Sequence, residues 1–155
     1  MNKTLYWEDV EVGVELPVLE KVATTQMLVK WAGASGDFNP LHFESDFAES
    51  QGVGIPIVHG QLKRAWLMQL VTDWIGIEGT VKKFSCQFRA MDYPVKMKTM
   101  VDPIESLPTH FCKGKLTAKF EENEIAFAEA EIWVENAKGE ISTPGKALVI
   151  LPKRM

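Results

Sequence analysis

The strongest hydrophobic pattern in the chain runs from Gly60 to Ile75, where apolar residues fall on almost every side of a helical wheel. These residues are Leu62, Ala65, Trp66, Leu67, Met68, Leu70, Val71, Trp74 and Ile75. A surface helix keeps a broad polar face, so a helix that is apolar nearly all round is typical of a buried one. The pattern therefore predicts a buried helix of about four turns, roughly 24 Å long at ~1.5 Å per residue.

After Gly79 the hydrophobic period changes from helical to two residues, which is typical of a half-buried strand. Its apolar positions are Phe84, Cys86, Phe88 and Ala90, and its polar positions are Lys83, Ser85, Gln87 and Arg89. Further extended segments are expected at residues 97–105, 111–121, 125–135 and 143–151, with turn signals at 121–123 and 137–140. Short turns between consecutive strands favour an antiparallel sheet. One buried helix followed by such strands predicts an α+β fold in which a sheet curls around the helix.

Two shorter helices are predicted before the buried one. The first covers residues 25–33, with Thr24 or Thr25 as its cap and Gly33 as its end. The second covers residues 45–50 with Ser45 as its N-cap, and residues 51–56 are expected to be a loop.

The bulk composition narrows the class of protein. A chain of 155 residues is expected to form a single domain over residues 1–155. A net charge of −4 provides no strong positive field for nucleic acid or an anionic membrane. Cys86 and Cys112 form no CxxC pair or Cys/His cluster, which argues against a metal site or a disulfide framework and favours a reducing cytoplasm.

Membrane insertion and secretion are not expected. The N-terminal segment MNKTLYWEDVEVG is polar and acidic, unlike a signal peptide. The apolar region at residues 65–77 is interrupted by Gln69, Thr72 and Asp73, so it is too short and too polar to span a bilayer. We therefore expect a cytoplasmic protein. A single sheet on one helix leaves open edges, which favours at least a dimer.

The loop GDFNPLH at residues 36–42 carries an acid and an imidazole in one short turn. Gly36 permits a tight turn before Asp37, and Pro40 prevents a continuous helix through His42. A stiff turn of this length can aim Asp37 and His42 at one small volume. At pH 7 ordinary pKa values of about 3.9 and 6.5 leave the carboxylate ionised and most of the imidazole neutral, a combination suited to holding a water molecule and moving its protons.

A second motif, VHG at residues 58–60, stands directly before the predicted buried helix. Backbone N–H groups at a helix N-terminus lack intrahelical acceptors and lie at the positive end of the helix dipole. The Gly60 amide is therefore a candidate oxyanion donor. His59 is interpreted as a structural residue, because Gly60 already accounts for the motif.

Together, GDFNPLH and IVHG resemble the signature of the MaoC-like, (R)-specific enoyl-CoA hydratase and dehydratase family, over about residues 5–93. The resemblance implies a hot-dog fold and syn addition of water to a trans-2-enoyl thioester, or its reversal. Asp37 and His42 would position and deprotonate the water and protonate Cα. Gly60 would bind the thioester oxygen, and Asn39 would brace the loop, although it also suits a simple Asx turn.

The resemblance also implies partners and cofactors. The substrate would be an acyl-CoA or acyl-carrier-protein thioester, with no metal and no organic cofactor. The chain would form a homodimer, or a heterodimer with another hot-dog subunit. A thioesterase on the same fold and a non-catalytic acyl-binding or stabilising subunit remain alternative hypotheses.

Further residues are expected to contact the substrate, namely Val58, Gln61, Arg64 and Trp66. Met68, Leu70 and Trp74 are interpreted as core or acyl-tunnel residues. Basic residues are either coenzyme A phosphate ligands or, more commonly, solvated charges; they are Lys63, Arg64, Lys82, Lys83 and Arg89.

The chain departs from the family pattern at three places. Gln61 and Lys63 replace a Met and a small or hydroxyl residue, and Met68 replaces a serine of some members. The segment DYPVKMKT lacks a Gly-Asp turn.

Overall fold

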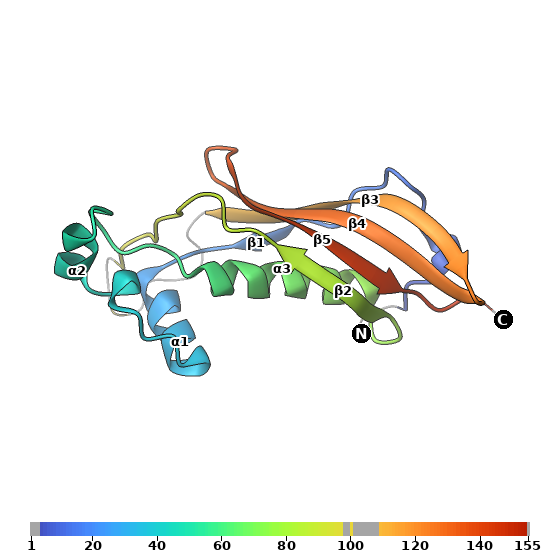
Figure 1. The fold of residues 1–155 in the computed structure, drawn as a ribbon, viewed down its shortest axis with the longest axis horizontal. Coiled ribbons are helices and arrows are strands. Elements are labelled where there is room, and N and C mark those ends of the chain that lie inside the picture. The colour runs from blue at the N-terminus through green and yellow to red at the C-terminus, as the bar shows by residue number, and fades with distance from the viewer. Residues whose placement is uncertain (1–3, 98–99, 101–108, 155) are drawn as a thin grey trace.

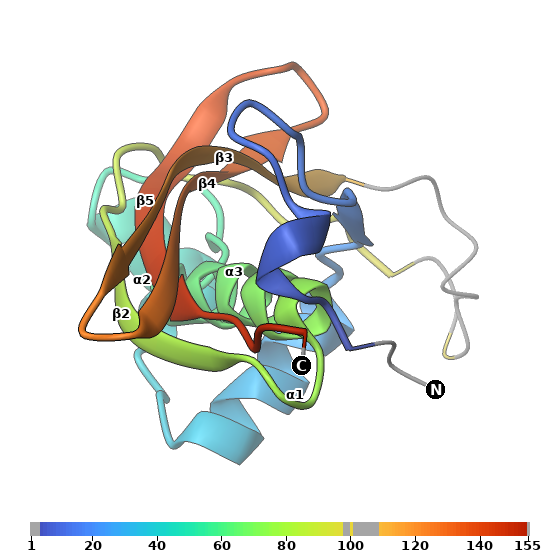
Figure 2. The same cartoon turned by 90° about the vertical axis from the view of Figure 1, so that its right-hand side faces the viewer.

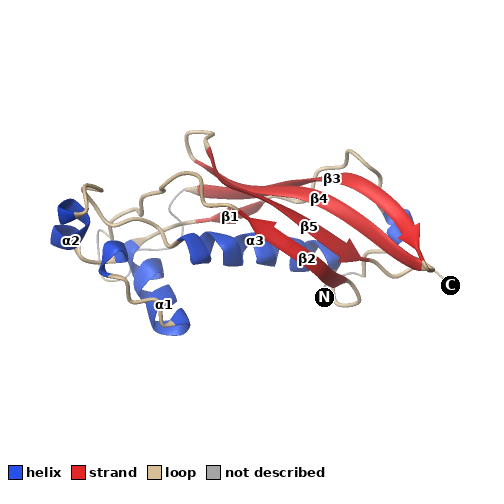
Figure 3. Ribbon diagram, in the orientation of Figure 1, coloured by secondary structure: helices blue, strands red, loops and turns tan. Residues whose placement is uncertain are grey.

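The computed structural model describes residues 4–97, 100 and 109–154, and it shows a sheet curled over one central helix (Figures 1 and 3). The 3₁₀ helices are η1 (Trp7–Asp9) and η2 (Pro40–His42). The α-helices are α1 (Thr25–Ser35), α2 (Ser45–Ser50) and α3 (Gly60–Ile75). The strands are β1 (Leu19–Lys21), β2 (Thr80–Cys86), β3 (His110–Glu122), β4 (Ile125–Asn136) and β5 (Ile141–Ile150).

The five strands form one sheet in the order β1-β3-β4-β5-β2, and all neighbouring strands are antiparallel. The sheet wraps around α3, as the end-on view in Figure 2 shows. Alternate residues of β4 face α3 and are buried, namely Ala128, Ala130, Ile132 and Val134. The predicted α+β class is therefore confirmed, and a curled antiparallel sheet on a central helix is the hot-dog arrangement that the resemblance implied.

Helix α3 has the predicted bounds and supplies a large part of the core. Its buried residues are Leu62, Lys63, Trp66, Leu67, Leu70, Val71 and Ile75. The exposed residues of the helix are the polar ones, namely Gln61, Arg64, Gln69, Thr72 and Asp73. Burial is therefore one-sided in the single chain, because the sheet covers only one side of the helix.

Helices α1 and α2 differ slightly from their predicted bounds. Thr24 caps α1 as predicted, since its side chain accepts from the Met27 N–H at 3.1 Å. The predicted end at Gly33 is wrong: the helix continues to Ser35 and stops at Gly36, whose left-handed backbone (φ 76°) lets its N–H reach the Ala32 carbonyl. Helix α2 begins at Ser45, but its N-cap is Glu44 and not Ser45.

The strands after α3 follow the predicted pattern, with one shift. Strand β2 covers Thr80–Cys86 and not the alternating segment 83–90, although Phe84 and Cys86 do pack against the core. Beyond β2 the amides of Gln87 and Arg89 still bond to Pro144 and Ser142 of β5. Strands β3, β4 and β5 lie within one or two residues of their predicted bounds. The extended segment predicted at residues 97–105 lies mostly outside the described residues.

Strand β1 was not predicted, because its three residues form a strand only by pairing with β3. Cys112 pairs with Leu19 of β1 and is fully buried in the core, and burial raises the pKa of its thiol to about 12, so it is a protonated core residue. In the described part of the chain, no helix is long and apolar enough to cross a membrane.

Candidate active site

The loop between α1 and α2 is stiffened by its own side chains. The Asn39 side chain accepts from the Leu41 N–H at 3.0 Å and caps η2, whose first residue is Pro40. The Asp37 carboxylate accepts from the Asn39 N–H at 3.4 Å. Such Asx-type bonds replace regular backbone pairing in a turn. They hold this short segment in one conformation, which agrees with the stiff turn expected from Pro40.

His42 is fixed by a bond to the segment that precedes α3. Its Nδ1 lies 2.8 Å from the Ile57 carbonyl oxygen, which can only accept, so Nδ1 carries the proton of the neutral ring. The Nε2 atom of the neutral ring therefore keeps its lone pair. His42 is one of the residues that line a cavity of about 530 Å³.

Asp37, His42 and His59 converge at one point. One side-chain oxygen or nitrogen from each of them lies within 4.8 Å of the other two. Asp37 is half-buried and lies beside His42, but it is not itself among the residues that line the cavity. The structure thus brings together the acid and the imidazole that the sequence places five residues apart.

His59 packs against His42 and contacts the main chain of Asp37. It is fully buried, its ring stacks on His42 at 3.7 Å between centroids, and its Nε2 lies 3.3 Å from the Asp37 carbonyl oxygen. Burial lowers the pKa of His59, and the neighbouring His42 lowers it further. The planes of the two rings are only 21° apart, so their in-plane lone pairs lie in two nearly parallel layers, which is unfavourable for binding one metal ion through both rings.

Gly60 is the first residue of α3 and also lines the cavity. A Cβ at this position would lie 3.0 Å from carbon atoms of the Phe88 ring, so the close packing here favours glycine. As a first-turn amide, its N–H has no acceptor within the helix. The site therefore places an acid and an imidazole beside the N-terminus of a helix.

Of the four residues predicted to contact substrate, only one lines the cavity. Val58 lines the cavity. Gln61 and Arg64 lie on the exposed side of α3 and bond to each other at 3.4 Å. Trp66 is buried in the core beside the His110 ring. The cavity-lining residues do not include Gln61, Arg64 or Trp66, and their contact with substrate stays a prediction.

The cavity wall that sequence analysis missed is the segment after β2. It contributes Phe88, Arg89, Ala90, Met91 and Tyr93 to the lining. Phe88, Met91 and Tyr93 are large and markedly exposed, and several exposed apolar side chains on one rim typically mark a binding or contact surface. The signal available in the sequence is that apolar residues recur between Arg89 and Asp92 after the end of β2.

Lys63 corrects the expectation for the basic residues. It is neither a solvated charge nor available to phosphate, because only 2% of its side chain is exposed and its Nζ lies 2.8 Å from Asp92 Oδ2. Burial alone would raise the pKa of Asp92, but hydrogen bonds from Lys63 and Ser142 lower it below its ordinary value. Lys63 lies three residues before Trp66 on the buried side of α3, and this spacing is the sequence signal for its burial.

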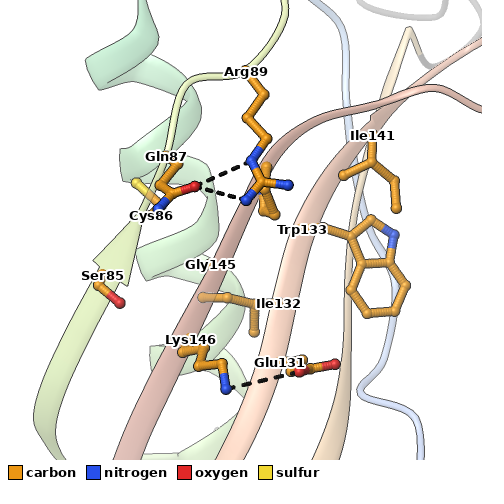
Figure 4. Close-up of a pocket in the computed structure, with 11 residues that line it drawn as sticks. Ser85, Cys86, Gln87, Arg89, Glu131, Ile132, Trp133, Ile141, Gly145 and Lys146 are labelled. Atoms are coloured by element: carbon orange, nitrogen blue, oxygen red, sulfur yellow. Dashed lines mark hydrogen bonds and ion pairs between the residues drawn. The ribbon is translucent and has the colours of Figure 1, made fainter.

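A second hollow, of about 500 Å³, lies on the face of the sheet that points away from α3 (Figure 4). Arg89 lines both cavities. Its Nε and Nη2 donate to the Gln87 side-chain oxygen at 3.1 and 2.8 Å, which turns the guanidinium along the sheet surface. Trp133 forms the opposite wall, and Lys146 lies 3.9 Å from Glu131 at the lower end in this view.

Comparison with known proteins adds sequence relatives. Residues 9–100 match the family model described as "MaoC like domain". A fatty acid synthase subunit beta of Gibberella zeae is 34% identical over 71 residues, which are 46% of this chain and 3% of that subunit. This chain thus spans only a small fraction of that relative. An (R)-specific enoyl-CoA hydratase of Aeromonas caviae is 26% identical over 145 residues, covering 94% of this chain and 98% of that enzyme.

Solved structures confirm the fold. The (R)-hydratase from A. caviae involved in PHA biosynthesis has a TM-score of 0.76 at 23% identity, covering 94% of this chain and 99% of the other. A chain of the ChsH1–ChsH2 complex from Mycobacterium tuberculosis has a TM-score of 0.73 at 20% identity, covering 92% and 98%. The family model spans more than half of the sequence. The chain therefore belongs to the MaoC-like domain family of hydratases and dehydratases.

Proposed function

We propose that this chain is an (R)-specific enoyl-CoA hydratase, or in the reverse direction a 3-hydroxyacyl-thioester dehydratase. The observation that carries the proposal is the state of His42. Its Nδ1 is held by the Ile57 carbonyl, which leaves Nε2 as the free base of a ring that lines the cavity, and one ring nitrogen lies within 4.8 Å of an Asp37 carboxylate oxygen. The full-length similarity to the A. caviae hydratase supports the same reaction class.

Asp37 and His42 hold one water molecule between them in this mechanism. His42 Nε2 takes a proton from the water as the water oxygen attacks Cβ of a trans-2-enoyl thioester. The electron pair of the double bond moves to the thioester carbonyl. Cα then receives a proton from the Asp37/His42 pair, on the same face to which the water was added. The product is the 3-hydroxyacyl thioester, and dehydration runs through the same steps in reverse.

The Gly60 amide stabilises the enolate that forms. It lies at the N-terminus of α3, where the backbone dipole favours negative charge. Loss of one such donor typically lowers the rate by about 10²–10³-fold. Glycine at this position lets the thioester oxygen approach the backbone closely.

The substrate is an acyl thioester of coenzyme A or of an acyl-carrier protein, and a second hot-dog subunit completes the cavity. Strand β2 is an open edge of the sheet, and the rim residues Phe88, Met91 and Tyr93 are exposed beside it. A partner, identical or not, would cover this apolar rim. The structural similarity to a chain of the ChsH1–ChsH2 complex supports a partner of the same fold.

The test is hydration of crotonyl-CoA by the purified protein, followed by the loss of enoyl absorbance. Asp37→Asn and His42→Ala should each lower kcat by at least ~10²-fold with unchanged circular dichroism. Asp46→Asn, an exposed acid in α2, is the matched control and should keep full activity. Near-wild-type hydration by either site variant would contradict the proposal.

Two other outcomes would assign a different function. Release of free thiol from an acyl-CoA without any change in enoyl absorbance would identify a thioesterase. Acyl-CoA binding without turnover, alone or with a partner chain, would identify a binding or stabilising subunit.

A further inference from the structure

We propose that Lys63 and Asp92 form a positioning pair that sets the Gly60 amide against the wall of the cavity. The inference rests on the proposed function, in which Gly60 binds the thioester oxygen. Neither residue donates to or accepts from the reacting atoms in this scheme. Each acts through the backbone that it holds.

The Lys63 ammonium group joins three parts of the chain. Its Nζ donates to the Asp92 carboxylate at 2.8 Å, to the Ala90 carbonyl at 3.0 Å and to the Ser142 hydroxyl at 3.4 Å. An ammonium group has three N–H donors, so all of them are used. The first turn of α3 is thereby tied to the cavity wall at residues 90–92 and to β5.

A second set of bonds closes this connection into a ring. The Asp92 carbonyl accepts at 2.8 Å from the N–H of Val58, the first residue of the VHG motif. The Lys63 N–H donates to the His59 carbonyl at 3.3 Å. The chain from Val58 to Lys63 is therefore held at both ends by Asp92, through its main chain at one end and its side chain at the other. Gly60 lies inside this ring.

The same ring also fixes the cavity wall. Ala90 and Lys63 line the cavity together with Gly60. Two residues before Ala90, the Phe88 ring packs so close to Gly60 that an added Cβ would lie 3.0 Å from it. Small errors in the placement of reacting groups are costly, since a shift of about 1 Å lowers rates by as much as ~10²-fold.

The pair contributes more to the orientation of the VHG segment than to the stability of the fold. Both side chains are only 2% exposed, and taking two charges out of water costs about as much as their attraction returns. Asn136 Nδ2 lies 3.4 Å from the second carboxylate oxygen, and His110 Nε2 lies 3.7 Å from the first. Apolar residues could fill such a space as stably, but they would not orient the VHG segment.

The decisive variant is Lys63→Met combined with Asp92→Leu, which removes the tie and leaves neither charge unpaired. Its matched control is Lys113→Met with Glu135→Leu, an ion pair of the same 2.8 Å length between β3 and β4, with side chains 33% and 22% exposed. For each protein, Tm, kcat and KM on crotonyl-CoA and the amide NMR shift of Gly60 would be measured. We expect the first variant to fold, to lose about 10–100-fold in kcat with a KM within roughly threefold of wild type, and to shift the Gly60 amide. The control should match wild type in all of these.

A folded double variant with wild-type kcat and an unmoved Gly60 amide would overturn the inference. If Lys63→Met/Asp92→Leu does not fold, Lys63→Gln/Asp92→Asn takes its place, and the same two results decide. Inactivity of the wild-type protein would instead count against the proposed function, and the Gly60 amide shift would then still decide whether the pair positions this segment.

Discussion

Gly60 is the residue at which the proposed chemistry can best be separated from folding. A Cβ there would meet the Phe88 ring at 3.0 Å, but Phe88 is 48% exposed, so the ring can move towards the cavity. Alanine suits a helix better than glycine by up to ~1 kcal/mol. Gly60→Ala should therefore keep or raise Tm while lowering kcat/KM for crotonyl-CoA about tenfold, as measured by thermal unfolding and steady-state kinetics.

The compensating variant tests the cause of that loss. Gly60→Ala combined with Phe88→Leu removes the ring and should recover part of the activity, measured against Phe88→Leu alone as the baseline. If the double variant is no better than Gly60→Ala, displacement of the ring is not the reason for the loss.

Asn39 offers a second prediction at the residue scale. Its side-chain oxygen caps η2 by accepting from the Leu41 N–H. Among the described residues, its NH₂ group has no hydrogen-bond partner in the loop. Asn39→Ala should lose about 1 kcal/mol of unfolding free energy and also lower kcat, because His42 lies at the end of η2. Asn39→Asp keeps an acceptor and should retain most of both in urea unfolding and hydration assays. Equal losses in the two variants would show that the amide nitrogen is needed.

At the scale of elements, local pattern was enough where an element depends on its own residues. The continuous apolar surface of α3 and the two-residue period of the later strands are properties of short windows, and those elements appear where predicted. The acid–imidazole convergence was also predictable, because Asn39 and Pro40 stiffen a single short loop. The end of α1 was missed because Gly33 is tolerated inside the helix and the left-handed Gly36 ends it.

Elements and contacts that depend on distant residues could not be predicted in this way. Strand β1 exists through its pairing with β3, about 90 residues further along the chain. Lys63 looked like a surface charge because its counter-ion, Asp92, is 29 residues away in a loop. The cavity wall at Phe88–Tyr93 begins where β2 ends, at Cys86. The alternating pattern alone predicted a strand end at Ala90, so it assigned part of this wall to the strand.

The turn between β3 and β4 carries a prediction at this scale. Asn123 and Glu124 both have positive φ, 51° and 67°, which is the geometry of a two-residue hairpin turn that favours Asn-Gly. A residue with a Cβ costs roughly 1–2 kcal/mol in this region. Glu124→Gly should therefore raise the unfolding free energy by about 1 kcal/mol in urea titrations. Glu122→Gly, within β3, should lower it by about 0.5–1 kcal/mol, and a gain there would contradict the conformational explanation.

The Lys63–Asp92 pair links α3 to the loop after β2 and carries a stability prediction of its own. Removing one partner leaves the other charge buried and unpaired, which typically costs about 3–5 kcal/mol. Lys63→Met should lose this amount in urea unfolding. The half-exposed pair offers the comparison: Lys113→Met should lose no more than ~1 kcal/mol, since solvent screens the charge left on Glu135. Equal losses in the two variants would mean that burial is not the cause.

At the scale of the whole molecule, the buried histidines make stability depend on pH. Burial lowers the pKa of both His59 and His110 below the ordinary value of 6.5. For His59 the neighbouring His42 adds to this effect, and the backbone bond to Asp37 opposes it. Around His110 the groups are Asp92, which raises its pKa, and Lys63, which lowers it, and the net direction is downward. A histidine with a lowered pKa in the folded state binds its proton more readily when the chain is unfolded.

The sign of the pH dependence follows from that difference. Between the lowered pKa of the folded state and 6.5, the unfolded chain binds more protons, so the unfolding free energy rises with pH. We expect urea titrations to show full stability above about pH 7 and a progressive loss as the pH falls below about 6.5. Asp92, whose pKa is also lowered, would extend the loss at pH values below about 3.8. His110→Gln should flatten the slope between pH 6.5 and 5.5, whereas a stability that increased on acidification through this range would show that the folded protein, and not the unfolded chain, prefers the charged histidines.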